Sequence, residues 1–160
     1  QGKQADLEKA LSTAIEINLR IPALIPSDYL PDVHTRLVMY KRLASAQNDE
    51  ALRDLQVEMI DRFGLLPDPV KNLIRVTQIK LKAESLGITK IEANSRGGKV
   101  EFGSDTHVDP LQIVKLVQSQ PRAFKLEGAN QLKFSVDLES VEKRIQTVDD
   151  LLDHLSPTKQ

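Results

Sequence analysis

The chain has 160 residues, of which 40% are hydrophobic and only 4% aromatic, and its formal net charge is −1. This length suits one domain, and the scarcity of aromatic residues predicts a mainly aliphatic core. The near balance of charge gives no global attraction to nucleic acid or to a membrane. The absence of cysteine excludes disulfides, thiol catalysis and thiolate metal sites. No apolar run approaches the roughly 18 residues needed to cross a bilayer, so a cytoplasmic protein is expected.

The pattern along the chain predicts three parts. Residues 1–12 are polar and are expected to form an arm or a linker remnant, and residues 157–160 a tail. The segment 13–156 between them is expected to be a single domain. Because the chain begins with Gln1 rather than Met, we expect it to be a piece of a longer protein.

The first structured segment is predicted to be a strand over residues 15–21, where apolar and polar residues alternate. Prolines recur from residue 22 to residue 31, which favours an extended connector because proline biases its predecessor away from helix. Asp32 is then expected to cap a helix that runs to about Gln47. Its apolar side is predicted to consist of Val33, Leu37, Tyr40 and Ala44.

A second helix is predicted to begin after Asn48 and to end at Gly64. Helical spacing places five apolar residues on one side, which we expect to face the core: Leu52, Leu55, Met59, Ile60 and Phe63. The opposite side carries an acidic ridge, which comprises Glu50, Asp54, Glu58 and Asp61, with Val57 inside it and Arg62 on its flank. Like charges four residues apart disfavour a helix by a few tenths of a kcal/mol each. The ridge is therefore either a solvated face or a docking surface for basic residues.

The rest of the chain alternates helices with strand pairs. Asp68 and Pro69 are expected to start a long helix that stops at Gly87, with Asp68 as its cap. The further predicted elements are a hairpin over 89–102 turning at 96–98, a helix after Asp109, a strand pair over 124–136 and a last helix over 138–155. This inventory predicts an α+β fold, a two-layer domain with a small, largely antiparallel sheet packed against about five helices. The order of the strands does not follow from it.

No catalytic, cofactor-binding or metal site is predicted. The three histidines, His34, His107 and His154, are isolated, and none has a second ligand at a persuasive spacing. The sequence has neither the glycine-rich phosphate loop nor the serine elbow of hydrolases. Arg96 and Lys99, on a glycine turn, could touch phosphate, although no aromatic platform for base stacking accompanies them.

Several segments together resemble the C-terminal domain of bacterial transcription-repair coupling factors, the Mfd family. The longest runs from Val57 through Glu-Met-Ile-Asp-Arg-Phe-Gly-Leu-Leu-Pro-Asp-Pro to Leu73. Shorter ones are Pro-Ala-Leu-Ile-Pro from residue 22, Asp-Tyr-Leu-Pro-Asp from 28, Arg-Leu at 36, Tyr-Lys-Arg-Leu-Ala from 40 and Gly-Lys-Val-Glu-Phe from 98. The likeness covers about residues 15–155.

The resemblance implies a non-catalytic regulatory domain of a large cytoplasmic, ATP-dependent DNA translocase of helicase type. In that family the parent binds double-stranded DNA, displaces stalled RNA polymerase and recruits UvrA for nucleotide excision repair. ATP and magnesium serve the parent, and no cofactor is implied for this domain. The domain is expected to be monomeric in isolation, to contact no membrane and to mask the UvrA-binding module of the same polypeptide as an autoinhibitory clamp.

Carried over to this chain, the polar contact of the clamp falls on Glu58, Asp61 and Arg62, which keep the family's Glu-x-x-Asp-Arg-Phe-Gly string. The acidic ridge adds Asp54 as a fourth interface residue. Two alternatives stay open. One is a nucleic-acid contact module that uses the tip at Arg96–Lys99 or the helix around residues 36–42, and the other is a passive cap on the motor.

Overall fold

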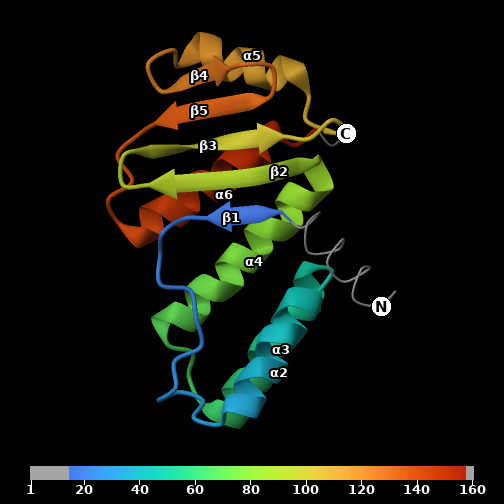
Figure 1. The fold of residues 1–160 in the computed structure, drawn as a ribbon, viewed down its shortest axis with the longest axis vertical. Coiled ribbons are helices and arrows are strands. Elements are labelled where there is room, and N and C mark those ends of the chain that lie inside the picture. Colours follow the sequence, from blue (N-terminus) through green and yellow to red (C-terminus); the bar gives the residue numbers. More distant parts are fainter. Residues whose placement is uncertain (1–14, 158–160) are drawn as a thin grey trace, which may run out of the picture.

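The computed structural model describes residues 15–157, and the predicted arm over residues 1–12 lies outside them. The described part is elongated, with a sheet at one end and a pair of helices at the other (Figure 1). Within it there are five helices and five strands. The predicted α+β class is therefore confirmed.

The sheet has the strand order β1-β2-β3-β5-β4. Its strands are β1 (Glu16–Asn18), β2 (Ile88–Asn94), β3 (Gly97–Phe102), β4 (Phe124–Glu127) and β5 (Gln131–Ser135). Only the pair β1–β2 is parallel, and the other three pairs are antiparallel. Both predicted strand pairs are confirmed, and the structure adds that β3 and β5 join them into one sheet.

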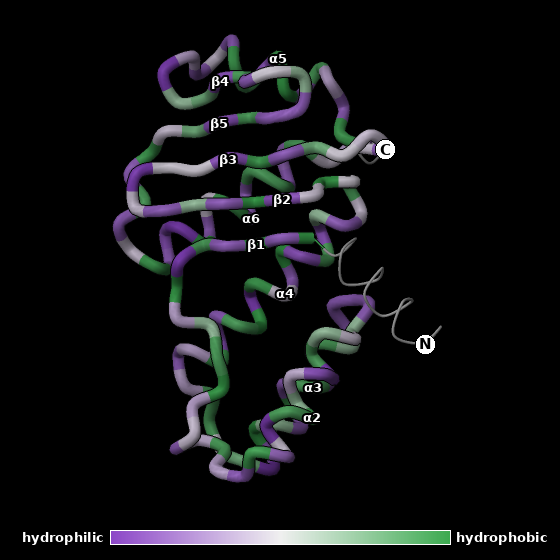
Figure 2. Tube along the Cα trace, in the orientation of Figure 1, coloured by the Kyte–Doolittle hydropathy of each residue, from purple (hydrophilic) through white to green (hydrophobic). Residues whose placement is uncertain are grey.

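Helices α4 (Asp68–Leu86) and α6 (Val141–Leu155) cover one face of this sheet (Figure 1). Hydrophobic and hydrophilic residues are interspersed along the strands (Figure 2), which is typical of a sheet with one face against the core. Buried residues from the sheet and both helices form one hydrophobic cluster, which includes Ile91, Val100, Leu132, Phe134 and Ile145. Helix α5 (Pro110–Ser119) packs beside β4 and α6 at the far edge.

The other end of the molecule is a helical unit with its own hydrophobic cluster. Helices α2 (Val33–Ser45) and α3 (Asp49–Phe63) pack against the first half of α4. Their shared core includes Met39, Leu43, Leu52, Met59 and Ile74, each no more than 2% exposed. Helix α4 therefore contributes to both clusters and joins them.

The proline-rich connector over residues 22–31 is fixed along this helical unit. Ile25 and Leu30 are buried in its cluster, and the backbone N–H of Ile25 donates to the Tyr40 hydroxyl at 2.7 Å. The Asn72 side chain donates to the Pro22 carbonyl at 2.9 Å. The predicted ordered connector is confirmed, but its part from Pro26 to Leu30 is a hydrogen-bonded turn rather than extended chain.

Asp32 caps its helix as predicted, and Asn48 and Asp109, each of which was predicted to precede a helix, also act as caps. The side chains of Asp32, Asn48 and Asp109 accept hydrogen bonds from backbone N–H groups in the first turns of α2, α3 and α5. Gly64 and Gly87 end α3 and α4 with positive φ angles of 99° and 72°.

Four details of the sequence prediction are wrong. Asp68 is the first residue of α4 and makes no capping hydrogen bond, because Pro67 occupies the cap position. On α2, three of the four residues predicted to face the core, Val33, Leu37 and Ala44, are exposed, since the helix turns Met39 and Leu43 inward instead. Ile60 is 40% exposed rather than part of the core. Helix α6 begins at Val141, after the cap residue Ser140, and not at residue 138.

The first strand is shorter than predicted because a buried arginine takes the carbonyls that would extend it. Arg144 on α6 is 7% exposed. One of its guanidinium nitrogens donates to the carbonyls of Leu19 and Arg20, each at 3.0 Å, and Nε donates to the Leu138 carbonyl at 3.0 Å. Arg20 has a φ of 53°, the left-handed region that a non-glycine residue rarely adopts. Arg144 thus ends β1 and ties it to the start of α6.

Replacing Arg144 with Met should lower the free energy of unfolding by about 3 kcal/mol, because two buried carbonyls and one partly buried carbonyl lose a charged donor. The matched variant Lys143→Met changes the exposed neighbour on the same helix and should stay within about 0.5 kcal/mol of the unmodified chain. Urea denaturation of the three proteins measures both values. Equal stability of the two variants would show that Arg144 is not the structural tie described here.

Candidate functional site

The outward side of α3 keeps most of the predicted acidic ridge exposed. Glu50, Asp54 and Asp61 are exposed, and none of them forms an ion pair with another residue in the range 15–157. Val57 lies among them with 56% of its surface exposed. The described part of the chain therefore presents three uncompensated carboxylates around an apolar contact point.

Glu58 departs from the prediction that it projects outward with the others. Its side chain is 34% exposed and accepts two hydrogen bonds from Arg42 on α2, at 2.6 and 2.7 Å. Arg62, one turn further along α3, donates a third at 2.8 Å. Glu58 is thus the centre of an Arg42–Glu58–Arg62 cluster that bridges α2 and α3.

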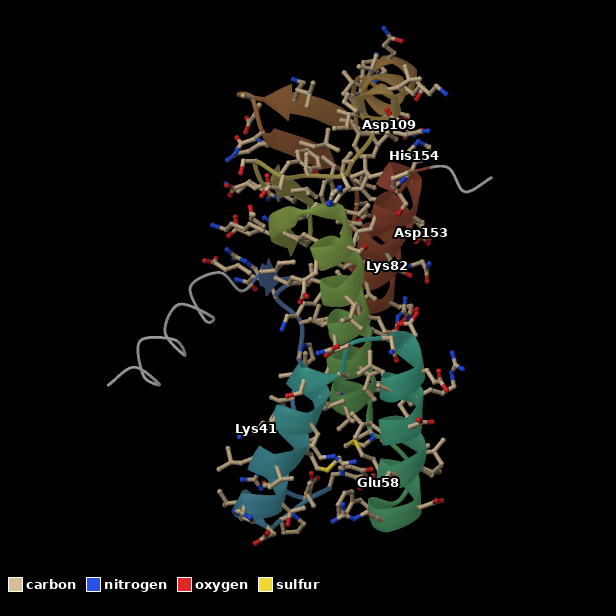
Figure 3. The ribbon with its side chains drawn as sticks, turned by 90° about the vertical axis from the view of Figure 1, so that its right-hand side faces the viewer. Lys41, Glu58, Lys82, Asp109, Asp153 and His154 are labelled. Atoms are coloured by element: carbon tan, nitrogen blue, oxygen red, sulfur yellow. The ribbon has the colours of Figure 1, made fainter. Side chains whose placement is uncertain are left out.

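This cluster lies beside a hollow between the two helices. The hollow has a volume of about 340 Å³ and is lined by residues that include Arg42, Asp54, Leu55 and Glu58. Glu58 faces the space between α2 and α3, whereas Lys41 points away from it (Figure 3). Asp54 and Glu58 therefore share this hollow, while Asp61 lies on the open side of α3.

The two arginines hold the Glu58 carboxylate ionised. The hydrogen bonds from Arg42, and then from Arg62, lower the pKa of Glu58 from 4.5 to about 2. The same contact raises the pKa of Arg42. The cluster consequently stays intact over the whole physiological range of pH and carries one excess positive charge.

Arg62 has a fixed position because it also stacks on an aromatic ring. Its guanidinium carbon lies 4.7 Å from the centre of the Phe63 ring. The Phe63 ring in turn meets the Tyr29 ring edge to face, with 6.0 Å between the ring centres. The Tyr29 hydroxyl donates to the carbonyls of Met59 and Gly64 at the end of α3. The connector thereby supports the end of α3 where Arg62 and Asp61 lie.

Sequence reasoning missed Arg42 as part of this site. The sequence pattern indicates Arg42 only as one of the cations around residues 36–42 that could contact nucleic acid. A sequence does not show which face of α2 turns towards α3. The available signal was the short link between the two helices, which makes them neighbours and places long side chains of α2 within reach of α3.

Comparisons with known proteins assign this domain to a family. The family model described as "TRCF domain" matches residues 19–113, more than half of the chain. The chain belongs to the TRCF domain family. The match begins just after β1 and ends in α5, so it covers the whole helical unit and the first hairpin.

Relatives of this TRCF domain are named as transcription-repair-coupling factors. That of Escherichia coli is 44% identical over 147 residues, which cover 92% of this chain, and that of Haemophilus influenzae is 41% identical over 152 residues, which cover 95%. The chain spans only 13% of the length of each. In fold it is similar to a crystal structure of the C-terminal domain of a transcription-repair coupling factor, with a TM-score of 0.74 at 22% identity, over 89% of this chain and 94% of that one.

The histidines and acidic residues of the described range form no candidate metal centre. In residues 15–157, no group of three or more His, Cys, Asp or Glu side chains is placed to hold a metal ion. His154 lies at the end of α6, and the neighbouring Asp153 pairs with Lys82 at 2.8 Å (Figure 3). None of the helices in the same range is long and apolar enough to cross a membrane.

The lowered pKa of Glu58 predicts how stability depends on pH. A carboxyl whose pKa is lower in the folded state adds stability above its unfolded pKa, near 4.5, and loses it as the pH falls towards 2. The unmodified chain should therefore be more stable than Glu58→Gln at pH 7, and the difference should shrink between pH 4.5 and 2. Chemical denaturation of both proteins at several pH values measures this. A difference that does not change over that range would contradict the described cluster.

Proposed function

We propose that this TRCF domain is a non-catalytic regulatory domain that docks through α3 on another module of the same polypeptide. In a transcription-repair coupling factor that module would be the one that binds UvrA, so docking would mask it as an autoinhibitory clamp. The supporting observation is the group of three exposed carboxylates around the exposed Val57, none of which forms an ion pair with another residue of the described range 15–157. In a docking surface, Val57 would add an apolar contact at the centre of a polar ring, which is the usual arrangement of a protein interface.

The four predicted interface residues take different roles in this proposal. Asp54 and Asp61 would accept hydrogen bonds from basic side chains of the partner module, because neither carboxylate is paired within the described residues. Arg62 would donate to an acceptor on the partner module, since only one of its guanidinium nitrogens donates to Glu58. Glu58 would act by holding Arg62 and Arg42 in place. The interface is therefore polar, with Val57 as its apolar centre.

A contact of this kind suits a reversible latch. Exposed ion pairs contribute about 0–1 kcal/mol each and weaken with salt, so several of them hold a closed state by a few kcal/mol. Inverting a 99:1 equilibrium between the closed and the open state needs about 5.5 kcal/mol of differential binding. An RNA polymerase that binds elsewhere on the parent could supply that amount, and UvrA would then reach the exposed module.

The parent protein in this proposal is a cytoplasmic, ATP-dependent DNA translocase that displaces stalled RNA polymerase during nucleotide excision repair. The relatives of this chain are named transcription-repair-coupling factors, and these names support this role for the parent. ATP and magnesium would act outside the present chain, because its sequence has no Gly-x-x-x-x-Gly-Lys-Ser/Thr segment to cradle phosphates.

Reversing two charges in the full-length coupling factor that carries this domain tests the clamp. Asp54→Lys with Asp61→Lys should raise the affinity for UvrA about tenfold, because a latch weakened by about 1.4 kcal/mol opens more often. Isothermal titration of UvrA into the purified protein measures the change.

The control for this experiment reverses two exposed acids outside α3, Glu84→Lys with Glu139→Lys, which changes the net charge by the same amount. It should leave the affinity for UvrA unchanged. If the α3 variant binds UvrA no better than the control variant, while its domain remains folded, the proposed clamp surface is wrong.

A further inference from the structure

A second charged feature lies on the face of the sheet that none of the described helices covers (Figures 1 and 3). Where the β2–β3 turn meets β5, this face has a hollow of about 370 Å³. Its floor contains Gly97 and Gly98, where a side chain would collide with the backbone of a neighbouring strand. Four cationic and two acidic side chains line it: Arg20, Arg96, Lys99, Lys133, Glu92 and Glu127.

The strand register places lysines directly opposite one another beside this hollow. Lys125 of β4 pairs in register with Lys133 of β5, and Lys133 pairs in register with Lys99 of β3. Side chains in such positions lie about 4.5–5.5 Å apart at Cβ, and like charges there destabilise a sheet. These three lysines form a row across three adjacent strands. An anionic partner would therefore reduce the repulsion among them.

The acidic residues nearby neutralise this row only in part. Lys99 and Glu92 approach to 3.7 Å, and Lys133 and Glu127 to 3.8 Å, distances that are too long for hydrogen bonds. Lys125 makes no ion pair with any residue in the range 15–157. The lysine N–H groups therefore keep their capacity to donate to a ligand.

Two arginines border the same hollow, and the fold fixes the backbone of both. The Arg20 carbonyl accepts from the buried Arg144, and its N–H donates to the Asn18 side chain at 3.1 Å. The Arg96 N–H donates to the Asn94 side chain at 2.8 Å, and its carbonyl accepts from Val136. Neither guanidinium forms an ion pair within residues 15–157. Arginine is well suited to bind phosphate because its guanidinium group can donate two parallel hydrogen bonds to phosphate oxygens.

We propose that this face of the sheet, which we call the basic hollow, binds the phosphate backbone of a nucleic acid. One phosphate would sit in the hollow between Arg20 and Arg96, and the row Lys99, Lys133 and Lys125 would contact its neighbours along the strand. An extended polyanion fits the row better than a single small anion does, because the three lysines span three strands. No aromatic side chain is exposed on this face, so the contacts go to phosphates rather than to stacked bases and carry no sequence preference.

This binding would be independent of docking through α3, because the basic hollow belongs to the sheet and α3 to the helical unit at the other end (Figure 1). The domain could therefore hold its partner module and touch nucleic acid at the same time. A translocase on DNA would present such a backbone close to its domains, but the inference rests on the register and the hollow alone.

A labelled duplex of 20 base pairs, titrated with the purified chain and followed by fluorescence anisotropy, tests the proposal. The chain should bind in the micromolar range at 50 mM salt, and the affinity should fall as salt rises, with a slope of about −3 to −4 in a plot of log K against log salt. Arg20→Glu with Arg96→Glu should weaken binding at least tenfold. Lys99→Gln with Lys133→Gln should make the slope less steep by about 2.

The matched control is Arg53→Glu with Lys71→Glu, two exposed cations of the helical unit. It changes the net charge as much as the arginine variant does and should leave the affinity within twofold. Absence of binding by the unmodified chain at 50 mM salt would overturn the proposal. So would equal losses in the control and in the arginine variant, because binding would then follow net charge and not the basic hollow. If the arginine variant does not fold, the lysine variant tests the proposal instead, and an unchanged slope of log K against log salt would overturn it.

Discussion

The structure depends on helix α4, a single element that serves two hydrophobic clusters. Its first half buries Val70 and Ile74 among α2, α3 and the connector, and its second half buries Ile79, Ala83 and Leu86 beneath the sheet. Lys82 on the same helix pairs with Asp149 and Asp153 of α6, at 2.6 and 2.8 Å. Because one continuous helix enters both clusters, the ridge on α3 and the open face of the sheet keep a fixed relation to one another.

Much of this architecture could be predicted from local signals in the sequence. Caps such as Asp32 and Asn48, and stops such as Gly64 and Gly87, act through neighbouring backbone groups, so they are visible in the chain itself. The strand order and the inward face of α2 depend on packing between distant segments, and no local pattern encodes them. Arg144 shows the same limit, because its partners Leu19 and Arg20 lie more than 120 residues away in the sequence.

For the candidate site, helical spacing correctly indicated Asp54, Val57 and Asp61 as exposed, but not the environment of Glu58. That carboxylate lies where the face of α3 turns towards α2, and only the packing of the two helices brings Arg42 to it. The outcome separates two kinds of charge on α3. Glu58 is compensated by Arg42 and Arg62, whereas Asp54 and Asp61 form no ion pair within residues 15–157 and would be free for the proposed partner.

The central claim is that the α3 ridge is covered in the resting protein, and the exposure of Val57 tests it directly. The chain contains no cysteine, so Val57→Cys provides a single thiol in the isolated domain at a position that is 56% exposed. We predict that a thiol reagent labels this position at least tenfold more slowly in the full-length coupling factor than in the isolated chain, as measured by mass spectrometry of the labelled peptide. Equal rates in the two proteins would contradict the claim that α3 is a docking surface.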